Sequence, residues 1–461
     1  MADNSSRFDR SQWSWAMFEW ARNPFVTIAI IYIAAPYYTS TVVGDPVRGQ
    51  EIWGWVNGIS GLTVAVLAPI LGAVADRTGA RKPWIGAFVG VLVPASFLLW
   101  FAPPQAAMPV IVAIGALYIV CNVTFEFTAV FHNSMLPSVV DEKRIGRLSG
   151  MGLALGNLSS LIILVGTLIF LSLPGVVDWS FVPKLPAFGL DQTAHEPERA
   201  AGPIVALWLG LFALPLFFFT KDRPRTAGGS LKRAAGDGVR QVITTIRSLK
   251  NYRQVATFLA ARMLYNDGKT ATLTFGGVYA VGIFGWGVLD MTIYGIVLSI
   301  FAVFGGFVGG WLDDTLGSKR AILIEIAGTM LGLLLGVSIT PDELFFVIPV
   351  TDSAPLHNLP FFQTLPEMAY LGVLILVAIF ITAAYASSRT MLARIAPPEK
   401  MTEFFGLYAL SGTATAWMAP IAIAVATAMF DSQRAGFSSI LLFLGAGWVL
   451  LLWVRPDKRD A

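Results

Sequence analysis

Residues 72–82 read Gly-Ala-Val-Ala-Asp-Arg-Thr-Gly-Ala-Arg-Lys, and residues 310–320 read Gly-Trp-Leu-Asp-Asp-Thr-Leu-Gly-Ser-Lys-Arg. Both stretches place an Asp four residues after a Gly, a second Gly three residues later, and then two basic residues. Each stretch also follows the second long apolar segment of its half of the chain. A motif that recurs at matching positions predicts two duplicated halves with similar structures.

Apolar sequence surrounds both copies of this motif. Apolar residues make up 55% of the 461 residues, and charged residues make up only 13%. An average soluble domain has about 25% charged residues. A bilayer core needs roughly 20 apolar residues per helix, and the chain offers about a dozen such segments joined by short polar loops. The sequence therefore predicts an all-α membrane protein with about 12 transmembrane helices in two six-helix bundles.

The distribution of Lys and Arg predicts which loops face the cytoplasm. With the N-terminus inside, 25 of the 32 basic residues fall in the two tails or in loops on the same side. The positive-inside rule therefore predicts cytoplasmic termini. The expected organisation is a first bundle over residues 1–219, a basic cytoplasmic linker over 220–253 and a second bundle over 254–461. The linker has the periodicity of an amphipathic surface helix, although a solvated linker is the alternative.

Several classes of function are disfavoured by the composition. Cys121 is the single cysteine and the three histidines are scattered, so we expect no disulfide, no metal site and no cofactor. The basic residues lie in loops, which indicates membrane topology rather than nucleic-acid binding. The sequence has no visible nucleophile–base pair of a membrane enzyme. We expect a monomeric protein that is not an enzyme, with the lipid bilayer and a small molecule as its partners.

Ionisable and amide side chains inside the predicted helices mark the candidate site for substrate and proton. A charge at the centre of a membrane helix costs about 2.5–3.5 kcal/mol on insertion scales, so such a residue usually faces a cavity and has a function. Glu325 lies in the ninth helix, and a role in helix packing explains it at least as well as a role in this site. The candidates lie in the first, fourth and seventh helices and are Glu19, Arg22, Asn23, Asn122, Glu126, Arg262, Asn266, Asp267 and Lys269.

The charges of this set suggest a mechanism. A low dielectric favours the protonated form of a carboxylate, so Glu126 or Asp267 is the candidate proton carrier. Arg22, with Arg262 or Lys269, would hold the anionic end of a substrate or balance the carboxylates when no substrate is bound. Clusters of both signs would suit a zwitterion such as an amino acid. A purely structural network of salt bridges is the alternative.

The seventh helix also carries a turn signal. The sequence Asn266-Asp267-Gly268 favours a turn, and transporters often unwind a helix at the binding site. We therefore expect this helix to be broken near its middle. The alternative is an unbroken helix with a polar patch against helices ten to twelve.

The repeated motif closely resembles the signature in the loop between helices two and three of the major facilitator superfamily of transporters. The resemblance implies the major facilitator fold, alternating access and a gating role for Asp76, with enforcement of topology by the basic residues as the alternative. The motif is not expected to bind substrate. The matching residues are Gly72, Asp76, Arg77, Gly79, Arg81 and Lys82 in the first copy and Gly310, Asp314, Gly317, Lys319 and Arg320 in the second.

Four further stretches resemble the vacuolar amino-acid effluxers linked to autophagy and their bacterial relatives. Glu19 and Arg22 depart from that pattern, in which Asp and a small or polar residue are usual. The resemblance implies an amino acid as the solute and a bacterial inner membrane as the location. Alternatives are export of a drug or lipid-like amphiphile, or a transport-inactive sensor on the same fold. The stretches are residues 15–25 (Trp-Ala-Met-Phe-Glu-Trp-Ala-Arg-Asn-Pro-Phe), 131–137 (Phe-His-Asn-Ser-Met-Leu-Pro), 264–268 (Leu-Tyr-Asn-Asp-Gly) and 403–412 (Glu-Phe-Phe-Gly-Leu-Tyr-Ala-Leu-Ser-Gly).

Overall fold

Long apolar helices form most of the described protein. The computed structural model describes residues 8–141, 144–222, 224, 252–350, 354–396 and 401–455. Eleven helical segments within these residues are long and apolar enough to span a bilayer. A further helix, α11 (Arg253–Phe284), is equally long but carries charged residues in its middle. The linker predicted over 220–253, including its surface helix, lies almost entirely outside the described residues.

The first half of the chain supplies six of these segments. The first span combines α1 (Arg10–Pro24) with η2 (Phe25–Tyr32), α2 (Ala34–Tyr37) and η3 (Tyr38–Val42), and η2 and η3 are wound as π-helix. The next four spans are α3 (Pro46–Thr78), α4 (Lys82–Leu98) with η4 (Leu99–Phe101), α5 (Met108–Val139), and α6 (Ile145–Thr167) with η6 (Leu168–Ser172). The sixth span combines α7 (Glu196–Arg199), α8 (Ala201–Phe212) and α9 (Leu214–Phe219). The short helix η7 (Ala187–Gly189) lies in the loop before it.

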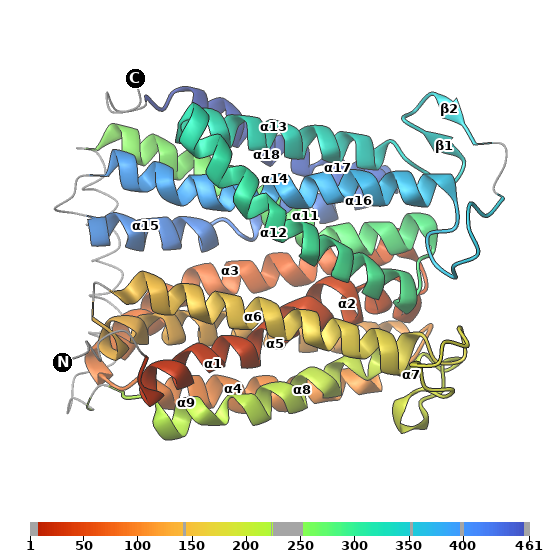
Figure 1. The fold of residues 1–461 in the computed structure, drawn as a ribbon, viewed down its shortest axis with the longest axis horizontal. Coiled ribbons are helices and arrows are strands. Elements are labelled where there is room, and N and C mark those ends of the chain that lie inside the picture. The colour runs from red at the N-terminus through yellow and green to blue at the C-terminus, as the bar shows by residue number, and fades with distance from the viewer. Residues whose placement is uncertain are drawn as a thin grey trace.

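The second half repeats this plan. It begins with α11 and adds one small antiparallel hairpin between its third and fourth spans. Figure 1 shows the two groups of helices lying side by side along one long axis. The remaining elements are α12 (Val288–Leu316), α13 (Ser318–Val337), β1 (Glu343–Leu344), β2 (Ile348–Pro349), α14 (Leu365–Ile395), α15 (Met401–Thr413), α16 (Met418–Phe430), α17 (Gln433–Ser438) and α18 (Ile440–Leu452).

The two ends of the molecule differ in which elements they carry. The start of α1 and the end of α18 lie at one end, which we call the terminal end, and α7 and the β1–β2 hairpin lie at the other, which we call the far end (Figure 1). Helices that cross between these ends satisfy their backbone hydrogen bonds internally, as lipid requires. The fold is therefore that of a multi-pass helical membrane protein.

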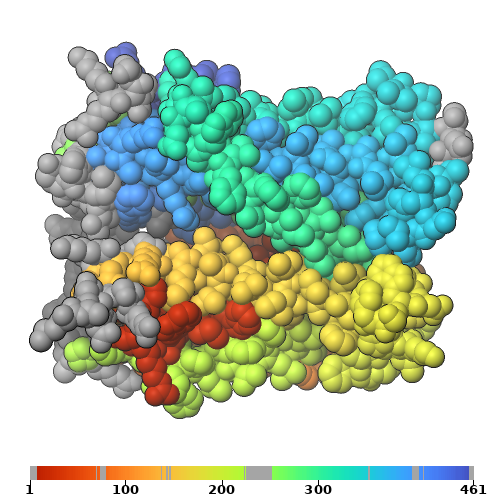
Figure 2. All heavy atoms as spheres, viewed as in Figure 1, coloured from red at the N-terminus to blue at the C-terminus, as the bar shows by residue number. Residues whose placement is uncertain are grey.

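The two halves meet closely near the far end. Gln50 of α3 donates hydrogen bonds to the Thr427 hydroxyl at 2.9 Å and to the backbone oxygen of Gln433 at 3.0 Å. The Gln433 side chain in turn donates to the backbone oxygen of Pro46 at 2.9 Å. Figure 2 shows the surfaces of the two halves touching toward this end. These side chains therefore hold α3 of one half against α16 and α17 of the other.

The break predicted in the seventh helix is wrong. α11 runs without interruption through Asn266, Asp267 and Gly268. A Cβ on Gly268 would lie 2.9 Å from Leu444 of α18, so this glycine provides close helix packing rather than a turn. The interruption occurs instead in the eleventh span, where residues 414–417 separate α15 from α16.

Candidate functional site

A cavity of about 330 Å³ lies between the two halves. Its volume is at the lower end of the range of roughly 300–1,000 Å³ that is typical of small-molecule pockets. The lining comes from the first, second, fourth, seventh and eleventh spans, so both halves contribute to one space. Its polar residues are Asn57 and Ser60 of α3, Asn122 and Glu126 of α5, Asp267, Thr270 and Thr274 of α11, and Thr413 of α15.

Glu126 and Asp267 bring one carboxylate from each half to this cavity. Asp267 is only 3% exposed, and its carboxylate accepts a hydrogen bond at 3.0 Å from the backbone N–H of Ala419. Ala419 lies in the first turn of α16, at the positive end of that helix. The interruption between α15 and α16 therefore creates a binding partner for the Asp267 carboxylate at mid-span.

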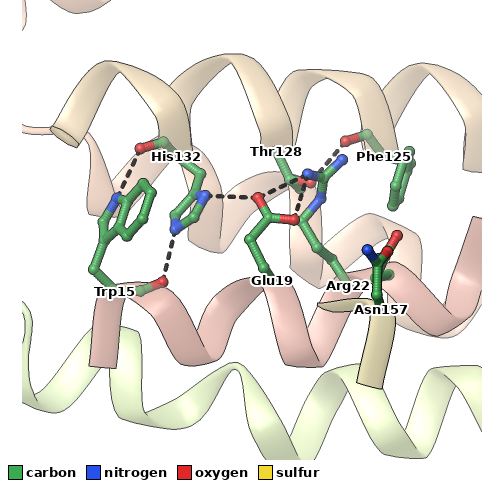
Figure 3. Close-up of polar contacts among 8 residues, drawn as sticks. Trp15, Glu19, Arg22, Phe125, Thr128, His132 and Asn157 are labelled. Carbon is green, nitrogen blue, oxygen red and sulfur yellow. Dashed lines mark hydrogen bonds and ion pairs between the residues drawn. The ribbon is translucent and has the colours of Figure 1, made fainter. Parts of the chain in front are cut away.

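Glu19 and Arg22 lie beside the cavity, in contact with each other (Figure 3). One guanidinium nitrogen of Arg22 donates to both Glu19 carboxylate oxygens, at 3.0 and 3.1 Å. The guanidinium carbon also lies 4.3 Å from the centre of the Phe125 ring, and Phe125 itself lines the cavity. Asn23 packs against Gly156 of α6, at the contact between α1 and α6. These three predicted site residues are not part of the cavity lining.

Arg262, Asn266 and Lys269 occupy a different face of α11 from Asp267. Arg262 donates hydrogen bonds to the Tyr408 backbone oxygen at 2.7 Å and to the Ser411 hydroxyl at 2.6 Å, and its guanidinium covers the Tyr408 ring at 3.5 Å. The Lys269 ammonium is fully buried, 3.6 Å from the centre of the Tyr385 ring. These contacts direct both cations toward α14 and α15, behind the cavity wall.

The structure therefore brings three of the nine predicted site residues to the cavity: Asn122, Glu126 and Asp267. The other six are not part of its lining. Glu325 is fully buried and accepts a hydrogen bond from Ser387 at 2.7 Å, so it joins α13 to α14. This contact agrees with the packing interpretation of Glu325.

Sequence reasoning missed several residues next to the site. His132 stacks on Trp15 between α5 and α1, and its Nδ1 lies 3.2 Å from a Glu19 carboxylate oxygen. Tyr408 and Ser411 hold Arg262. A histidine in an apolar helix, six residues after Glu126, was the signal that could have added His132 to the set. The contacts of Arg262 had no such signal, because they depend on how α15 is rotated.

The first copy of the repeated motif forms a tight turn between α3 and α4. Gly79 has a φ of +78°, a conformation that glycine adopts without strain. Arg81 is 2% exposed, and its side chain donates to the Gly79 backbone oxygen at 2.5 Å and to the Ser134 hydroxyl at 3.2 Å. The backbone N–H groups of Arg81 and Lys82 donate to the carboxylate of Asp222. The side chains of Asp76 and Arg77 lie outside the part of the chain that is described.

The second copy of the motif forms the same turn, but the acid that it buries is Asp313 and not Asp314, which the spacing of the motif indicates. Gly317 has a φ of +79°. Asp314, the residue that the spacing singles out, is exposed. Its neighbour Asp313 is 4% exposed and forms an ion pair with Arg394 of α14 at 2.9 Å. Lys319 donates to the backbone oxygen of Leu452 at 2.8 Å, and Arg320 is exposed.

Comparisons with known families agree with this architecture. The family model described as "Vacuole effluxer Atg22 like" matches residues 141–460, and the Major Facilitator Superfamily model matches residues 7–164. The chain is 25% identical to the uncharacterised MFS-type transporter YxiO of Bacillus subtilis, over 98% of this chain and 96% of that protein. It is 20% identical to autophagy-related protein 22 of Yarrowia lipolytica, over 68% of this chain and 51% of that protein.

Solved structures with the same fold include transporters of different solutes. A D-xylose-proton symporter superposes with a TM-score of 0.66 and 10% identity, over 98% of this chain and 99% of that one. The nucleoside transporter NupG superposes with a TM-score of 0.61 and 13% identity, over 96% of this chain and 96% of that one. At these identities the likeness shows the fold alone. From the family matches and the fold together, the chain belongs to the Atg22-like family of the major facilitator superfamily of membrane transporters.

Proposed function

We propose that this transporter carries a small polar solute with an amine group, such as an amino acid, and that it couples this movement to protons. The observation that supports this proposal best is that Glu126 and Asp267 line one cavity from opposite halves. Carboxylates are the natural partners of an ammonium group. In transporters of this kind, substrate and coupling-ion sites lie near mid-membrane between two halves that rock around them.

The same two carboxylates provide a reason for coupling. An ionised carboxylate in a closed, dry cavity is costly unless a proton, an ammonium group or a fixed cation compensates it. A proton and a substrate amine can therefore substitute for each other at Glu126 or Asp267. A transporter that closes around its site only when these carboxylates are compensated would link the two movements.

The predicted cations have a supporting part in this mechanism. Arg22, Arg262 and Lys269 lie behind the lining, so they would balance the carboxylates electrostatically rather than grip the substrate. The carboxylate end of an amino acid would then meet neutral donors of the lining, such as Asn57, Asn122 and Thr270. This arrangement favours solutes that carry an amine over purely anionic solutes.

We also propose a bacterial inner-membrane location, with the terminal end in the cytoplasm and one chain as the working unit. The asymmetry of Lys and Arg between the two sets of loops supports this orientation. In this arrangement the bundles are residues 1–219 and 254–461, joined by a cytoplasmic linker. The Gln50–Gln433 contacts would then close the cavity on the outer side of the membrane.

The substrate class can be tested on the purified transporter. A thermal-shift panel of amino acids, amines, dipeptides, sugars and nucleosides should give its largest stabilisation with compounds that carry an amine. Stabilisation by sugars or nucleosides alone would contradict the proposed class.

Proton coupling needs a transport assay. In proteoliposomes, the best ligand should accumulate when an outward proton gradient is imposed, because a proton and the amine exchange for each other at the same carboxylates. We expect Glu126→Gln and Asp267→Asn to lose most of this accumulation while exchange without a gradient stays measurable. Asp178→Asn, which changes an exposed acid in a loop outside the cavity and the repeated motif, is the matched control and should keep both activities. If accumulation survives in both cavity variants, neither carboxylate carries the coupling proton.

A further inference from the structure

The His132 ring is held by contacts on both of its nitrogens (Figure 3). Its Nε2 lies 2.9 Å from the backbone oxygen of Trp15, and its Nδ1 lies 3.2 Å from the Glu19 carboxylate. The indole of Trp15 stacks on the ring with 4.3 Å between centroids, and the indole N–H donates to the backbone oxygen of His132 at 3.1 Å. The ring is fully buried, so its position is fixed by these neighbours and not by water.

These contacts determine where the ring protons lie. A backbone oxygen only accepts hydrogen bonds, so Nε2 facing the Trp15 oxygen must carry a hydrogen. An ionised carboxylate is also an acceptor only, and Nδ1, which forms no hydrogen bond with a described residue, lies 3.2 Å from a Glu19 oxygen. A second proton on Nδ1 would make this contact an ion pair instead of two acceptors that face each other. Turning the ring over would put carbon atoms against both oxygens, which removes both contacts. The geometry therefore favours one proton more than a neutral imidazole and an ionised carboxylate provide.

Arg22 indicates which partner holds this extra proton. Its guanidinium donates to both oxygens of Glu19, and such donation favours the ionised carboxylate. The extra proton then belongs to Nδ1. We propose that His132 and Glu19 form a proton-binding site within the first half, separate from the two cavity carboxylates, and that His132 is the doubly protonated imidazolium in this conformation.

The neighbouring charges connect this site to the cavity. The described ionisable groups that contacts connect to this site are Glu19 and Arg22 on α1. On α5, Glu126 lies six residues before His132, and Arg81 hydrogen-bonds Ser134, two residues after it. An imidazolium with Arg22 and Glu19 has a net charge of one positive unit, which an ionised Glu126 neutralises. When a proton or an ammonium group neutralises Glu126 instead, the excess positive charge favours release of the His132 proton. Occupancy of the cavity is thereby linked to this second proton site.

α6 closes the site from a third side. A Cβ on Gly152 would lie 3.4 Å from both the Glu19 and the Trp15 side chains, so the helix backbone is already in close contact with them. The side chains of Glu19 and Arg22 are only 17% and 12% exposed. Glu19 is therefore the more exposed member of the Glu19–His132 pair.

Nitrogen NMR of the whole protein can test the proposal, because the chain has only three histidines. The full chain, labelled with ¹⁵N-histidine and held in lipid nanodiscs, gives ring-nitrogen signals that distinguish imidazolium from neutral imidazole. His195 and His357 lie in loops at the far end, so His195→Gln and His357→Gln assign their signals without altering the buried site. The remaining signal is that of His132.

At about pH 7.5 a free imidazole is mostly neutral, since its ordinary pKa is about 6.5. We expect His132 to show both nitrogens protonated at this pH. In Glu19→Gln the imidazolium signal should be lost, because the amide can donate to Nδ1. Glu198→Gln, which removes the acid 3.1 Å from the His195 ring, is the matched control and should leave His132 unchanged. A neutral His132 in the unmodified protein, or an imidazolium that persists in Glu19→Gln, would overturn the proposal.

Discussion

Single buried charges in this protein are compensated in several different ways. Arg262 donates two hydrogen bonds and covers the ring of Tyr408. The Asp267 carboxylate accepts a hydrogen bond from a backbone N–H in the first turn of α16. The Lys269 ammonium lies over the ring of Tyr385. Asp313 has a direct ion pair with Arg394. Lipid offers no water to replace a missing partner, so each of these contacts keeps a polar group at membrane depth at a tolerable cost.

The Asp313–Arg394 pair gives a prediction at the scale of one residue. Arg394→Met leaves the Asp313 carboxylate, whose side chain is 5% exposed, without its ion-pair partner. Loss of one partner of a buried polar contact costs about 1–3 kcal/mol, so we expect the free energy of unfolding to fall by about this amount. Chemical unfolding of the purified protein in detergent measures the change.

Two variants act as controls for this prediction. Asp314→Ala changes the exposed neighbour and should alter stability by less than about 0.5 kcal/mol. The double variant Arg394→Met with Asp313→Leu should recover most of the lost stability, because replacing both partners removes the unpaired charge. If Arg394→Met is as stable as the unmodified protein, the ion pair contributes nothing to the fold.

The same pair shows why the site was only partly predictable at this scale. Spacing in the repeated motif pointed to Asp314, whereas the side of α12 that faces α14 selects Asp313 for burial. In α11, the sequence correctly separated Asp267 from the face shared by Arg262, Asn266 and Lys269. The sequence did not show which of the two faces meets the cavity. Rotation of a helix about its axis depends on packing with its neighbours, and a single sequence contains little information about it.

At the scale of the element, the number and order of the helices were predictable, and their irregularities were not. Bilayer thickness fixes the length and hydropathy of each span, so these appear directly in the composition. The turn signal at Asn266–Gly268 did not break α11, because intrahelical hydrogen bonds are hard to replace in an apolar environment. The true interruption, at residues 414–417, is stabilised by the Asp267 carboxylate from another helix.

Glycines on α3 lead to a prediction about closure of the far end. A Cβ at Gly54 would lie 2.7 Å from both the Ala424 side chain and the Pro420 backbone oxygen of the other half. Backbone atoms cannot move aside as a flexible side chain can, so Gly54→Ala should push α3 away from α16. We expect the variant to favour conformations in which the halves are further apart at the far end.

Spin labels on Arg48→Cys and Asp431→Cys can report this separation, because both residues are exposed at the far end of α3 and α16. Electron–electron distance measurements should show a longer mean distance in Gly54→Ala than in the labelled parent. Gly90→Ala on α4 is the matched control, since a Cβ there meets no described atom within 4 Å. An unchanged distance distribution in Gly54→Ala would show that this contact does not hold the halves together.

For the whole molecule, the sequence predicted the fold and the family correctly. The duplicated motif, the apolar spans and the resemblance to vacuolar effluxers agree with the family matches and the solved structures. The conformation was not predictable, because the same residues must support closure at either end during transport. Contacts such as Gln50 with Thr427 show that the far end is closed in this structure.

The orientation of the molecule in the membrane follows from its loops and can be measured. If the terminal end is cytoplasmic, the loops at the far end face the outside of the cell. Leu185 and Val347 lie in such loops, one in each half, and are 74% and 77% exposed. We expect Leu185→Cys and Val347→Cys to react with a membrane-impermeant maleimide in intact cells. Arg253→Cys, at the exposed start of α11, should react only after the cells are permeabilised.

The native chain suits this measurement because Cys121 is its only cysteine and is fully buried. The unmodified protein should therefore give almost no labelling and serves as the background control. Two reporters in different halves also separate orientation from local accessibility, since an even number of spans puts both loops on one side. Labelling of Arg253→Cys in intact cells, with Leu185→Cys and Val347→Cys protected, would reverse the proposed topology. The Gln50–Gln433 contacts would then close the cytoplasmic side, and Glu126 and Asp267 would be accessible from outside.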